Sequence, residues 1–242
     1  MEHAIVLKPE VIGQINFLPV TNTLLVSWIT MAVLISLSII TTWKVKAVPT
    51  GLQNVFEFIV GFGYTTVEDL AGEKKAKVFF PIVMTFFLLI MAANWLGLLP
   101  GFGTITFKGV PLLRSANSDL NMTLALALVS AVVTHLLAIK YLSFSGYLKR
   151  WISLELFPVF IFVGLLEIVA EFTKIVSLSF RLFGNIFAGE VVLSTIAGIF
   201  AFVVPLPFYF LEIVVGFVQA AVFMMLTLTF MTILSQKHGE GH

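Results

Sequence analysis

Apolar residues are gathered into long runs that short polar segments separate. Residues 23–42, 78–100 and 120–142 are each apolar along almost their whole length. A helix rises about 1.5 Å per residue, so about 20 residues cross the hydrocarbon core of a bilayer, which is about 30 Å thick. Each of these three runs therefore predicts a membrane-spanning helix.

The apolar pattern after residue 150 is longer than one span. Residues 151–204 are apolar almost throughout, and Pro205 and Pro207 separate them from a last apolar run at residues 208–235. As one helix, residues 155–204 would measure about 75 Å, more than twice the thickness of the hydrocarbon core. The stretch is therefore either two upright spans or one long helix that lies steeply oblique to the membrane normal.

Lysine and arginine positions bear on this choice. With one oblique helix, nine basic residues lie on the side of the C-terminus: Lys44, Lys46, Lys74, Lys75, Lys77, Lys140, Lys149, Arg150 and Lys237. Three lie on the opposite side: Lys8, Lys108 and Arg114. The positive-inside rule then places the N-terminus outside and the C-terminus inside. Two upright spans would move only Lys237, but no turn residues surround Lys174, where a break would fall, so we favour one helix.

Residues 50–70 have a different pattern. Apolar residues recur at helical spacing on one face (Leu52, Val55, Phe56, Ile59, Val60), and polar residues occupy the other (Gln53, Asn54, Glu57). This pattern predicts an amphipathic helix on the inner membrane surface, within an inner segment that runs from residue 50 to 75. A helix packed on a soluble partner is the alternative.

The predicted fold is therefore an all-α integral membrane protein with a single membrane domain. It has about five membrane-embedded helices and one interfacial helix, and the last two membrane helices are long and steeply tilted. Residues 1–22 form an outer N-terminal segment, 101–119 an outer loop and 236–242 an inner tail.

Composition excludes several classes of protein. Of the 242 residues, 59% are apolar and 11% are charged, whereas soluble domains carry about 25% charged residues. There are no cysteines, so disulfides and cysteine-ligated metals are excluded. A net charge of +1 argues against a nucleic-acid partner. We expect neither a metal nor a cofactor.

The chemistry of such a chain must come from polar residues inside the membrane. The long helix carries Glu167, Glu171, Lys174, Arg181 and Glu190, and the last helix carries Glu212 and Gln219. An arginine in mid-membrane costs about 2.5–3.5 kcal/mol on insertion scales. Such a residue is kept where it faces protein or water, which makes these positions candidate functional residues.

Helical geometry arranges these residues in a stripe. Glu167, Lys174, Arg181 and Asn185 fall within roughly 40° of one another around the long helix. Small residues, among them Ser177, flank the stripe, so that another helix can approach it closely. No acidic residue of the long helix lies on this face near the depth of Arg181.

Depth divides the acids into two groups. Glu190 lies about 13 Å outward of Arg181 and points roughly to the opposite side, whereas Glu167 lies about 21 Å inward. Glu212 is nearer the outer face, and Gln219 lies deeper on the same side of the last helix. A cation between two offset acidic groups makes a poor through-channel for protons. It suits a mobile carboxylate from another polypeptide, which collects a proton on one side and releases it on the other. Structural ion pairs, such as Glu171 with Lys174, are the alternative.

Four motifs resemble subunit a of rotary F-type ATP synthases. They are residues 177–190 around Arg181, 219–227 in the last helix, 94–100 with Asn94 and Trp95, and 119–121 with Asp119 and Asn121. The likeness covers most of the chain from the second span onward. The first 75 residues match mainly by layout.

The resemblance implies a function in which Arg181 faces a rotating ring of c subunits. It would force each ring carboxylate to release its proton and would block a short circuit between two half-channels. Glu190, Glu212, Asn185 and Gln219 would line the proton path, with Glu190 and Glu212 on the outer side and Glu167 at the inner exit.

The other candidates for the path are Ser177, Glu171, Lys174, Asp119 and Asn121. Two positions depart from the family. Several relatives carry histidine where this chain has Glu212, and some carry an acid where it has Gly97, to which we assign no role.

The resemblance also implies partners and a location. The chain would be a non-catalytic, proton-translocating subunit that binds the c-ring, the peripheral-stalk b subunits and the rest of the synthase, with Na⁺ as the other possible coupling ion. No transit-like segment is recognised at the N-terminus, so we expect a bacterial plasma membrane.

Other classes fit less well. Only His135 lies within a predicted span, so axial haem ligands are lacking, and neither His-Glu-x-x-His nor a Gly-Lys dipeptide is present, which excludes the corresponding metalloprotease and P-loop motifs. The remaining alternative is a self-contained ion-coupled transporter that uses the membrane acids as its own ion sites.

Overall fold

The computed structural model describes residues 8–16, 18–43, 45–99, 102, 105–107, 109–151, 159–199 and 203–236. Within these ranges it has six α-helices, which are α1 (Asn22–Thr42), α2 (Leu52–Ala71), α3 (Glu73–Gly97), α4 (Leu120–Trp151), α5 (Val159–Ile199) and α6 (Pro205–Leu234). A short 3₁₀ helix, η1 (Ala116–Ser118), precedes α4. Two small antiparallel hairpins, which the sequence did not predict, pair β1 (Val11–Ile15) with β2 (Leu18–Thr21) and β3 (Thr106–Phe107) with β4 (Val110–Pro111).

Five helices are long and apolar enough to cross a membrane. They are α1, α3, α4 as far as Tyr147, α5 from Gly164, and α6, and α2 is not among them. The prediction of an all-α membrane protein with about five membrane helices and one further amphipathic helix is therefore confirmed.

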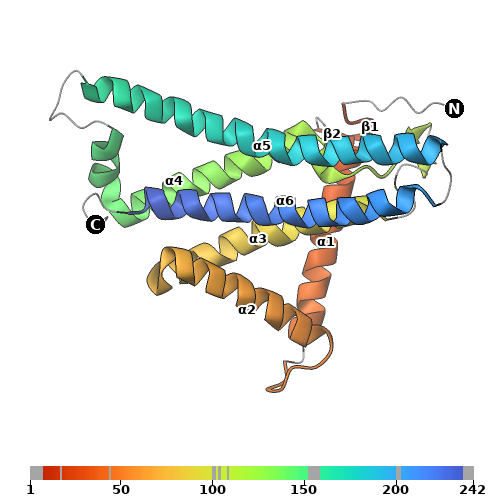
Figure 1. Ribbon diagram of the computed structural model, residues 1–242, viewed down its shortest axis with the longest axis horizontal. Helices are drawn as coiled ribbons and strands as arrows, with labels where there is room; N and C mark the ends of the chain where they lie inside the picture. Colours follow the sequence, from red (N-terminus) through yellow and green to blue (C-terminus); the bar gives the residue numbers. More distant parts are fainter. Residues whose placement is uncertain are drawn as a thin grey trace.

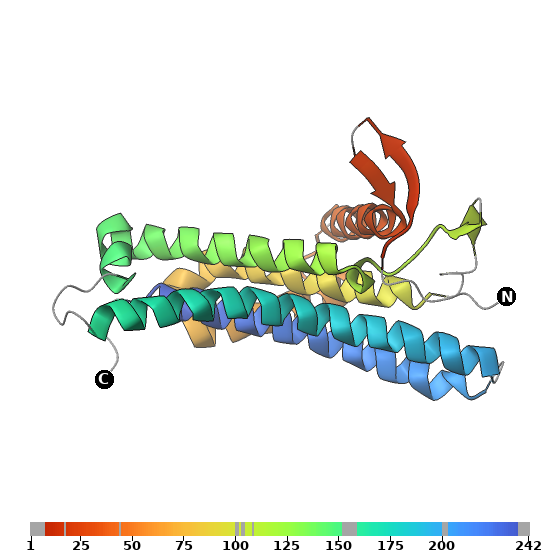
Figure 2. The same ribbon diagram turned by 90° about the horizontal axis from the view of Figure 1, so that it is seen from above.

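The long apolar stretch forms one helix rather than two spans. In α5, 41 residues run without interruption, which corresponds to a length of about 60 Å, twice the thickness of the hydrocarbon core. The following α6 has 30 residues, and the two helices lie side by side along the long axis of the molecule, whereas α1 crosses this direction (Figures 1 and 2). Residues 152–158, at the predicted start of the long helix, lie outside the described residues.

The third span is followed by a break. Helical residues continue to Trp151, but Ser143 interrupts the helix with φ 64° and ψ 154°. A positive φ is uncommon for a residue other than glycine. The predicted span, residues 120–142, thus ends directly before the break, and the segment after it leaves the axis of α4 (Figure 1), with the Tyr147 hydroxyl 2.9 Å from His135 Nδ1.

The apolar core lies between α3 and α6, and α4 and α5 cover it. Its fully buried side chains include Phe79 and Ile90 from α3 and Phe223, Leu228 and Met231 from α6. The rings of Phe86 and Phe223 are 5.4 Å apart, within the range of a favourable aromatic pair.

The amphipathic helix α2 packs on α3 with only part of its surface. Gly63 and Val67 face α3, where the sulfur of Met84 lies close to Gly63. Phe58 and Phe62 are largely exposed. Large exposed apolar side chains on a surface helix are typical of a helix that lies on a bilayer.

Asn94 and Trp95 fasten α6 to α3 and explain one of the four motifs. The Asn94 side-chain amide donates to the carbonyl of Gly216 at 3.0 Å, and the Trp95 indole N–H donates to the carbonyl of Ile213 at 3.1 Å. Asn117, in η1, donates to Asn94 Oδ1 at 2.7 Å. This network therefore sets the position of the first half of α6 relative to α3.

Hydroxyl pairs fasten α4 to the two long helices. Thr123 and Ser179 are 3.1 Å apart between α4 and α5, and Ser130 and Thr227 are 2.9 Å apart between α4 and α6. Hydrogen bonds between apolar helices in a membrane contribute about 0.6 kcal/mol each on average. They fix the register of α5 and α6 more than they add to stability.

The Asn94 network yields a stability prediction. Replacing Asn94 with Ala leaves the buried amide of Asn117 without its shortest acceptor, which costs about 1–3 kcal/mol. In denaturant titrations of the detergent-solubilised protein, we expect the free energy of unfolding to fall by this amount. The matched control is Asn54→Ala, because Asn54 is exposed on α2. Equal effects of the two changes would contradict the assigned role of Asn94.

Candidate functional site

Two glutamates lie on the neighbouring helices α5 and α6, and one of them contacts the backbone of α5. Glu190 lies on α5, and Glu212, which is only 8% exposed, lies on α6. The Glu212 carboxylate occupies the space that a Cβ atom at Gly189 would fill, and both its oxygens lie there. A glycine at position 189 therefore allows the carboxylate to lie against the α5 backbone, next to Glu190.

Arg114 joins this cluster from the loop before α4. Its Nε lies 3.8 Å from Glu190 Oε2. The same nitrogen donates to Ser118 Oγ at 3.1 Å, and Nη1 donates to the carbonyl of Lys8 at 3.3 Å. The side chain of Arg114 is 9% exposed, so this cation is built into the protein and partly balances the charge of Glu190. Arg114, Glu190 and Glu212 are hereafter called the outer cluster.

Asp119 and Asn121 begin α4. Asp119 Oδ1 accepts the backbone N–H of Asn121 at 2.9 Å, which caps the helix, and Oδ2 accepts the hydroxyl of Thr23 on α1 at 3.0 Å. Both oxygens thus have structural partners, and Asn121 itself is exposed. A part for these residues in a proton path stays a prediction.

The middle of α5 has a packed face and an open face. Leu178, Leu182 and Ile186 are buried against the bundle. One residue before each of them, Ser177, Arg181 and Asn185 are exposed. Arg181 and Asn185 of the predicted stripe therefore lie on the open side of α5, whereas Lys174 of the same stripe faces α4 and α6.

Arg181 forms no ion pair within the described part of the chain. Along α5, Glu190 is about 13 Å away in one direction and Glu171 about 15 Å in the other. Neither acid is near enough to neutralise the guanidinium. Its open face is the side on which a further polypeptide could supply an acid.

A second polar cluster lies between α4 and the first half of α5. Lys174 Nζ donates to Glu171 Oε1 at 2.6 Å, as the i, i+3 alternative predicted. His135 Nε2 lies 3.7 Å from Glu171 Oε2, and the Tyr147 hydroxyl lies 2.9 Å from His135 Nδ1. We call Glu171, Lys174, His135 and Tyr147 the inner cluster.

A small cavity adjoins the inner cluster. It measures about 20 Å³, and Ser130, Thr134, Glu171 and Lys174 contribute polar atoms to its wall. This volume suffices for one water molecule, which needs two to four polar partners. Lys174 Nζ also lies 4.8 Å from the centre of the Phe230 ring on α6. The inner cluster therefore has contacts with α4, α5 and α6.

The remaining predicted residues lie between or beyond the two clusters. Gln219 is partly buried on α6, beside the buried Ala220 and two turns after Glu212. Glu167 is partly exposed on α5, one turn before Glu171. The predicted residues thus come from α5 and α6 in the expected order, with Arg181 between the clusters.

Three residues of the candidate site were not predicted from the sequence. Arg114 was considered only as an outer charge, His135 only as a possible haem ligand in a predicted span, and Gly189 was not singled out. The signals were a basic residue in a loop adjoining an outer acid, a histidine inside an apolar run, and a glycine directly before Glu190. Within the described residues, no group of three or more His, Asp or Glu side chains could hold a metal ion.

Comparisons with known proteins agree with the four motifs. The family described as ATP synthase A chain matches residues 24–232. Subunit a of ATP synthase from Geobacter sp. (strain M21) is 37% identical over 206 residues, which is 84% of this chain and 83% of that protein.

Two further relatives extend the match. Subunit a from Geotalea uraniireducens (strain Rf4) is 35% identical over 218 residues, covering 89% of this chain and 87% of its own length. Subunit a from Gloeobacter violaceus is 35% identical over 223 residues, covering 91% and 86%. With its five apolar spans and a match along most of its length, the chain belongs to the ATP synthase A chain family.

Proposed function

We propose that this chain is the stator subunit that offers two offset proton half-channels to a rotating ring of c subunits. Proton flow through the half-channels turns the ring and thereby drives ATP synthesis. The observation that carries this proposal is Arg181, a cation within a membrane helix that is exposed on the open face of α5 and forms no ion pair within the described chain.

The partner of Arg181 is a carboxylate of the ring. A guanidinium within the hydrocarbon region is retained only where an acid or water compensates its charge. When a ring carboxylate comes opposite Arg181, the positive charge favours its ionised form and thus the release of its proton. The same charge repels free protons and prevents direct flow between the half-channels.

The outer half-channel leads through the outer cluster. Glu190 and Glu212 accept protons from the outer solution, while Arg114 balances part of the charge of Glu190. Gln219 and Asn185 line the remaining way to the ring. The carboxylate of Glu212 takes the place that histidine occupies in several relatives and performs the same relay with a different acid.

The inner half-channel leads from the ring past Ser177 to Glu167. Lys174 and Glu171 lie beside this way, and their mutual hydrogen bond of 2.6 Å keeps the lysine from competing with Arg181 for the ring carboxylate. Released protons leave at the inner surface, where most lysine and arginine residues of the chain lie.

Energetics favour a rotor over a single gated step. One charge crossing 100 mV gains about 2.3 kcal/mol, so the work of one ATP requires several protons coupled to one mechanical cycle. The chain itself carries out no ATP chemistry, which belongs to other subunits. It sits in a bacterial plasma membrane, with the N-terminus outside and the C-terminus in the cytoplasm, and binds the c-ring and the peripheral-stalk b subunits.

Replacing Arg181 with Ala tests the central role. In the complex reconstituted into liposomes, we expect ATP-driven proton pumping, followed with a pH-sensitive dye, to be abolished. Passive proton conductance should persist or rise, because the cation that blocks a short circuit is gone. The control is Phe180→Ala, also on the exposed side of α5, which should pump normally. Intact pumping by the Arg181 variant would overturn the role.

The contact of Glu212 with Gly189 gives a second test. In Gly189→Ala, the added methyl group occupies the space of the Glu212 carboxylate, and overpacking of this kind costs about 1–3 kcal/mol unless the side chain moves away. We expect Glu212 to move and proton pumping to fall, while assembly of the complex is unchanged. Gly61→Ala on α2 is the matched control, because no atom lies within 4 Å of a Cβ there and α2 lies away from the open face of α5. Equal pumping by the two variants would contradict the placement of Glu212 in the path.

Cross-linking distinguishes a stator from a self-contained ion-coupled transporter. A cysteine at Ser177, on the open face, should form a disulfide with cysteines placed along a ring helix. A cysteine at Leu178, which is buried, should not. A transporter would also exchange ions when the chain is reconstituted alone, and such activity without the ring would rule out the stator function.

A further inference from the structure

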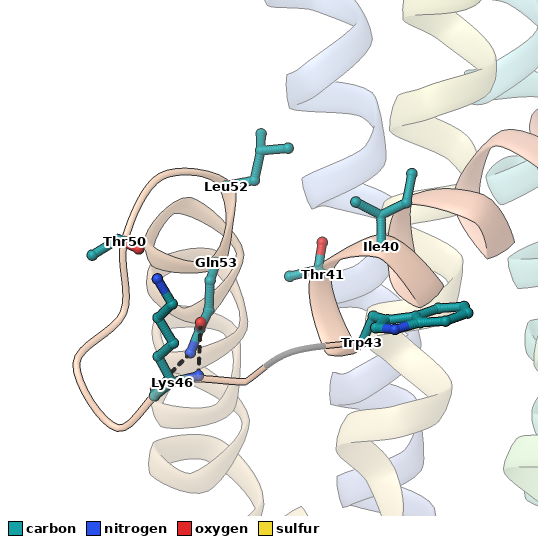
Figure 3. Close-up of a pocket in the computed structure, with 7 residues that line it drawn as sticks. All are labelled: Ile40, Thr41, Trp43, Lys46, Thr50, Leu52 and Gln53. Carbon is teal, nitrogen blue, oxygen red and sulfur yellow. Dashed lines mark hydrogen bonds between the residues drawn. The ribbon is translucent and has the colours of Figure 1, made fainter.

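A cavity lies where α1 ends and α2 begins, away from both polar clusters. It measures about 450 Å³, which is within the range of about 300–1,000 Å³ of small-molecule sites. Figure 3 shows two walls, with Ile40, Thr41 and Trp43 at the end of α1 opposite Lys46, Thr50, Leu52 and Gln53 at the start of α2 and in the loop before it.

The loop that carries Lys46 is held in a fixed shape. Gln53, which is only 8% exposed, accepts the backbone N–H of Lys46 at 3.2 Å and donates to its carbonyl at 2.9 Å (Figure 3). Gly51, with φ 62°, then turns the chain into α2. Such a conformation is easy for glycine and strained for other residues. A buried side chain therefore positions the backbone of the one basic residue in the described wall of the cavity.

The wall combines a cation with apolar side chains. Lys46 is exposed at one edge. Ile40, Leu52 and Trp43 are also exposed, and Trp43 is 75% accessible although it is a large aromatic. Tryptophan is enriched where hydrocarbon meets headgroups, and lysine is enriched on the cytoplasmic side. A second lysine, Lys44, precedes Lys46 by two positions in the sequence and lies outside the described residues.

An acidic side chain lies beside Gln53 but does not belong to the described wall of the cavity. Glu57 Oε1 accepts a hydrogen bond of 2.7 Å from the Gln53 side chain, but Glu57 is not part of the described cavity wall. The charge at the cavity is thus positive, and its surface is otherwise largely apolar. This combination matches one kind of occupant, with a negatively charged head and a hydrocarbon tail.

We infer that the cavity binds an anionic phospholipid of the inner leaflet. The phosphate lies beside Lys46, the glycerol region contacts Trp43, and an acyl chain follows Ile40 and Leu52 into the gap where α1 and α2 diverge. Basic pockets between helices on the cytoplasmic side bind such headgroups. The lipid fills the space between the crossing helix α1 and the surface helix α2. This site requires the membrane placement of α1 but not the proton path.

The test measures bound lipid in the assembled complex. The complex is reconstituted with equal amounts of dioleoyl phosphatidylglycerol and dioleoyl phosphatidylcholine and extracted into mild detergent. The lipid that stays bound to it is then identified and quantified by native mass spectrometry. We expect retained phosphatidylglycerol, which Lys46→Ala lowers about fivefold, the factor that corresponds to about 1 kcal/mol for one lysine near an anionic surface. Gln53→Leu, which frees the loop, should also lower it.

Matched controls separate the site from general surface charge. Lys74→Ala removes an exposed lysine on the same side of the membrane and should leave the bound lipid unchanged, and added inorganic phosphate should not displace it. Equal losses with Lys46→Ala and Lys74→Ala, equal retention of both lipids, or displacement by phosphate would overturn the inference. So would a helix of another subunit filling the cavity in a structure of the complex.

Discussion

A guanidinium in a membrane needs a compensating negative charge, and the arrangement of the other helices follows from where that charge can come from. Arg181 is held on α5 with its own acids more than two helical turns away in either direction. Within the described residues, the chain therefore supplies no acid that neutralises Arg181. This constraint separates it from ordinary membrane proteins, in which such a residue is paired within the bundle, and it makes the open face of α5 the natural place for a second polypeptide.

Keeping one face of a membrane helix open requires that its other face be well fixed. Leu178, Leu182 and Ile186 pack against the bundle, and hydroxyl pairs join α4 to both long helices. On the other side of the core, Asn94 and Trp95 of α3 bind backbone carbonyls of α6. These hydrogen bonds fix the positions of the helices along one another. They are needed because in lipid the hydrophobic effect does not drive helices together. The two polar clusters owe their positions to this register.

Much of this architecture could be read from the sequence. The lengths of the apolar runs set the number of membrane helices, and the lack of turn residues around Lys174 indicated that α5 is continuous. The periodicity of α5 placed Arg181 and Asn185 on one face. Contacts between helices could not be read in this way, because they depend on crossing angles and on loop paths. Thus the approach of Glu212 to Gly189, of Arg114 to Glu190 and of His135 to Glu171 appeared only in three dimensions. The break at Ser143 has no glycine or proline signal of its own.

The slant of α5 and α6 has a consequence for direction. Glu171 and Glu190 are 19 positions apart on one oblique helix, so the inner and outer clusters are displaced within the plane of the membrane as well as in depth. In a stator of the proposed kind, a ring carboxylate that takes up a proton at one cluster and releases it at the other must move parallel to the membrane. Its sense of travel then depends on which cluster faces the higher proton concentration, and a mirror-image slant would reverse it. In the proposed stator, the direction of rotation would thereby follow from the direction in which α5 and α6 lean.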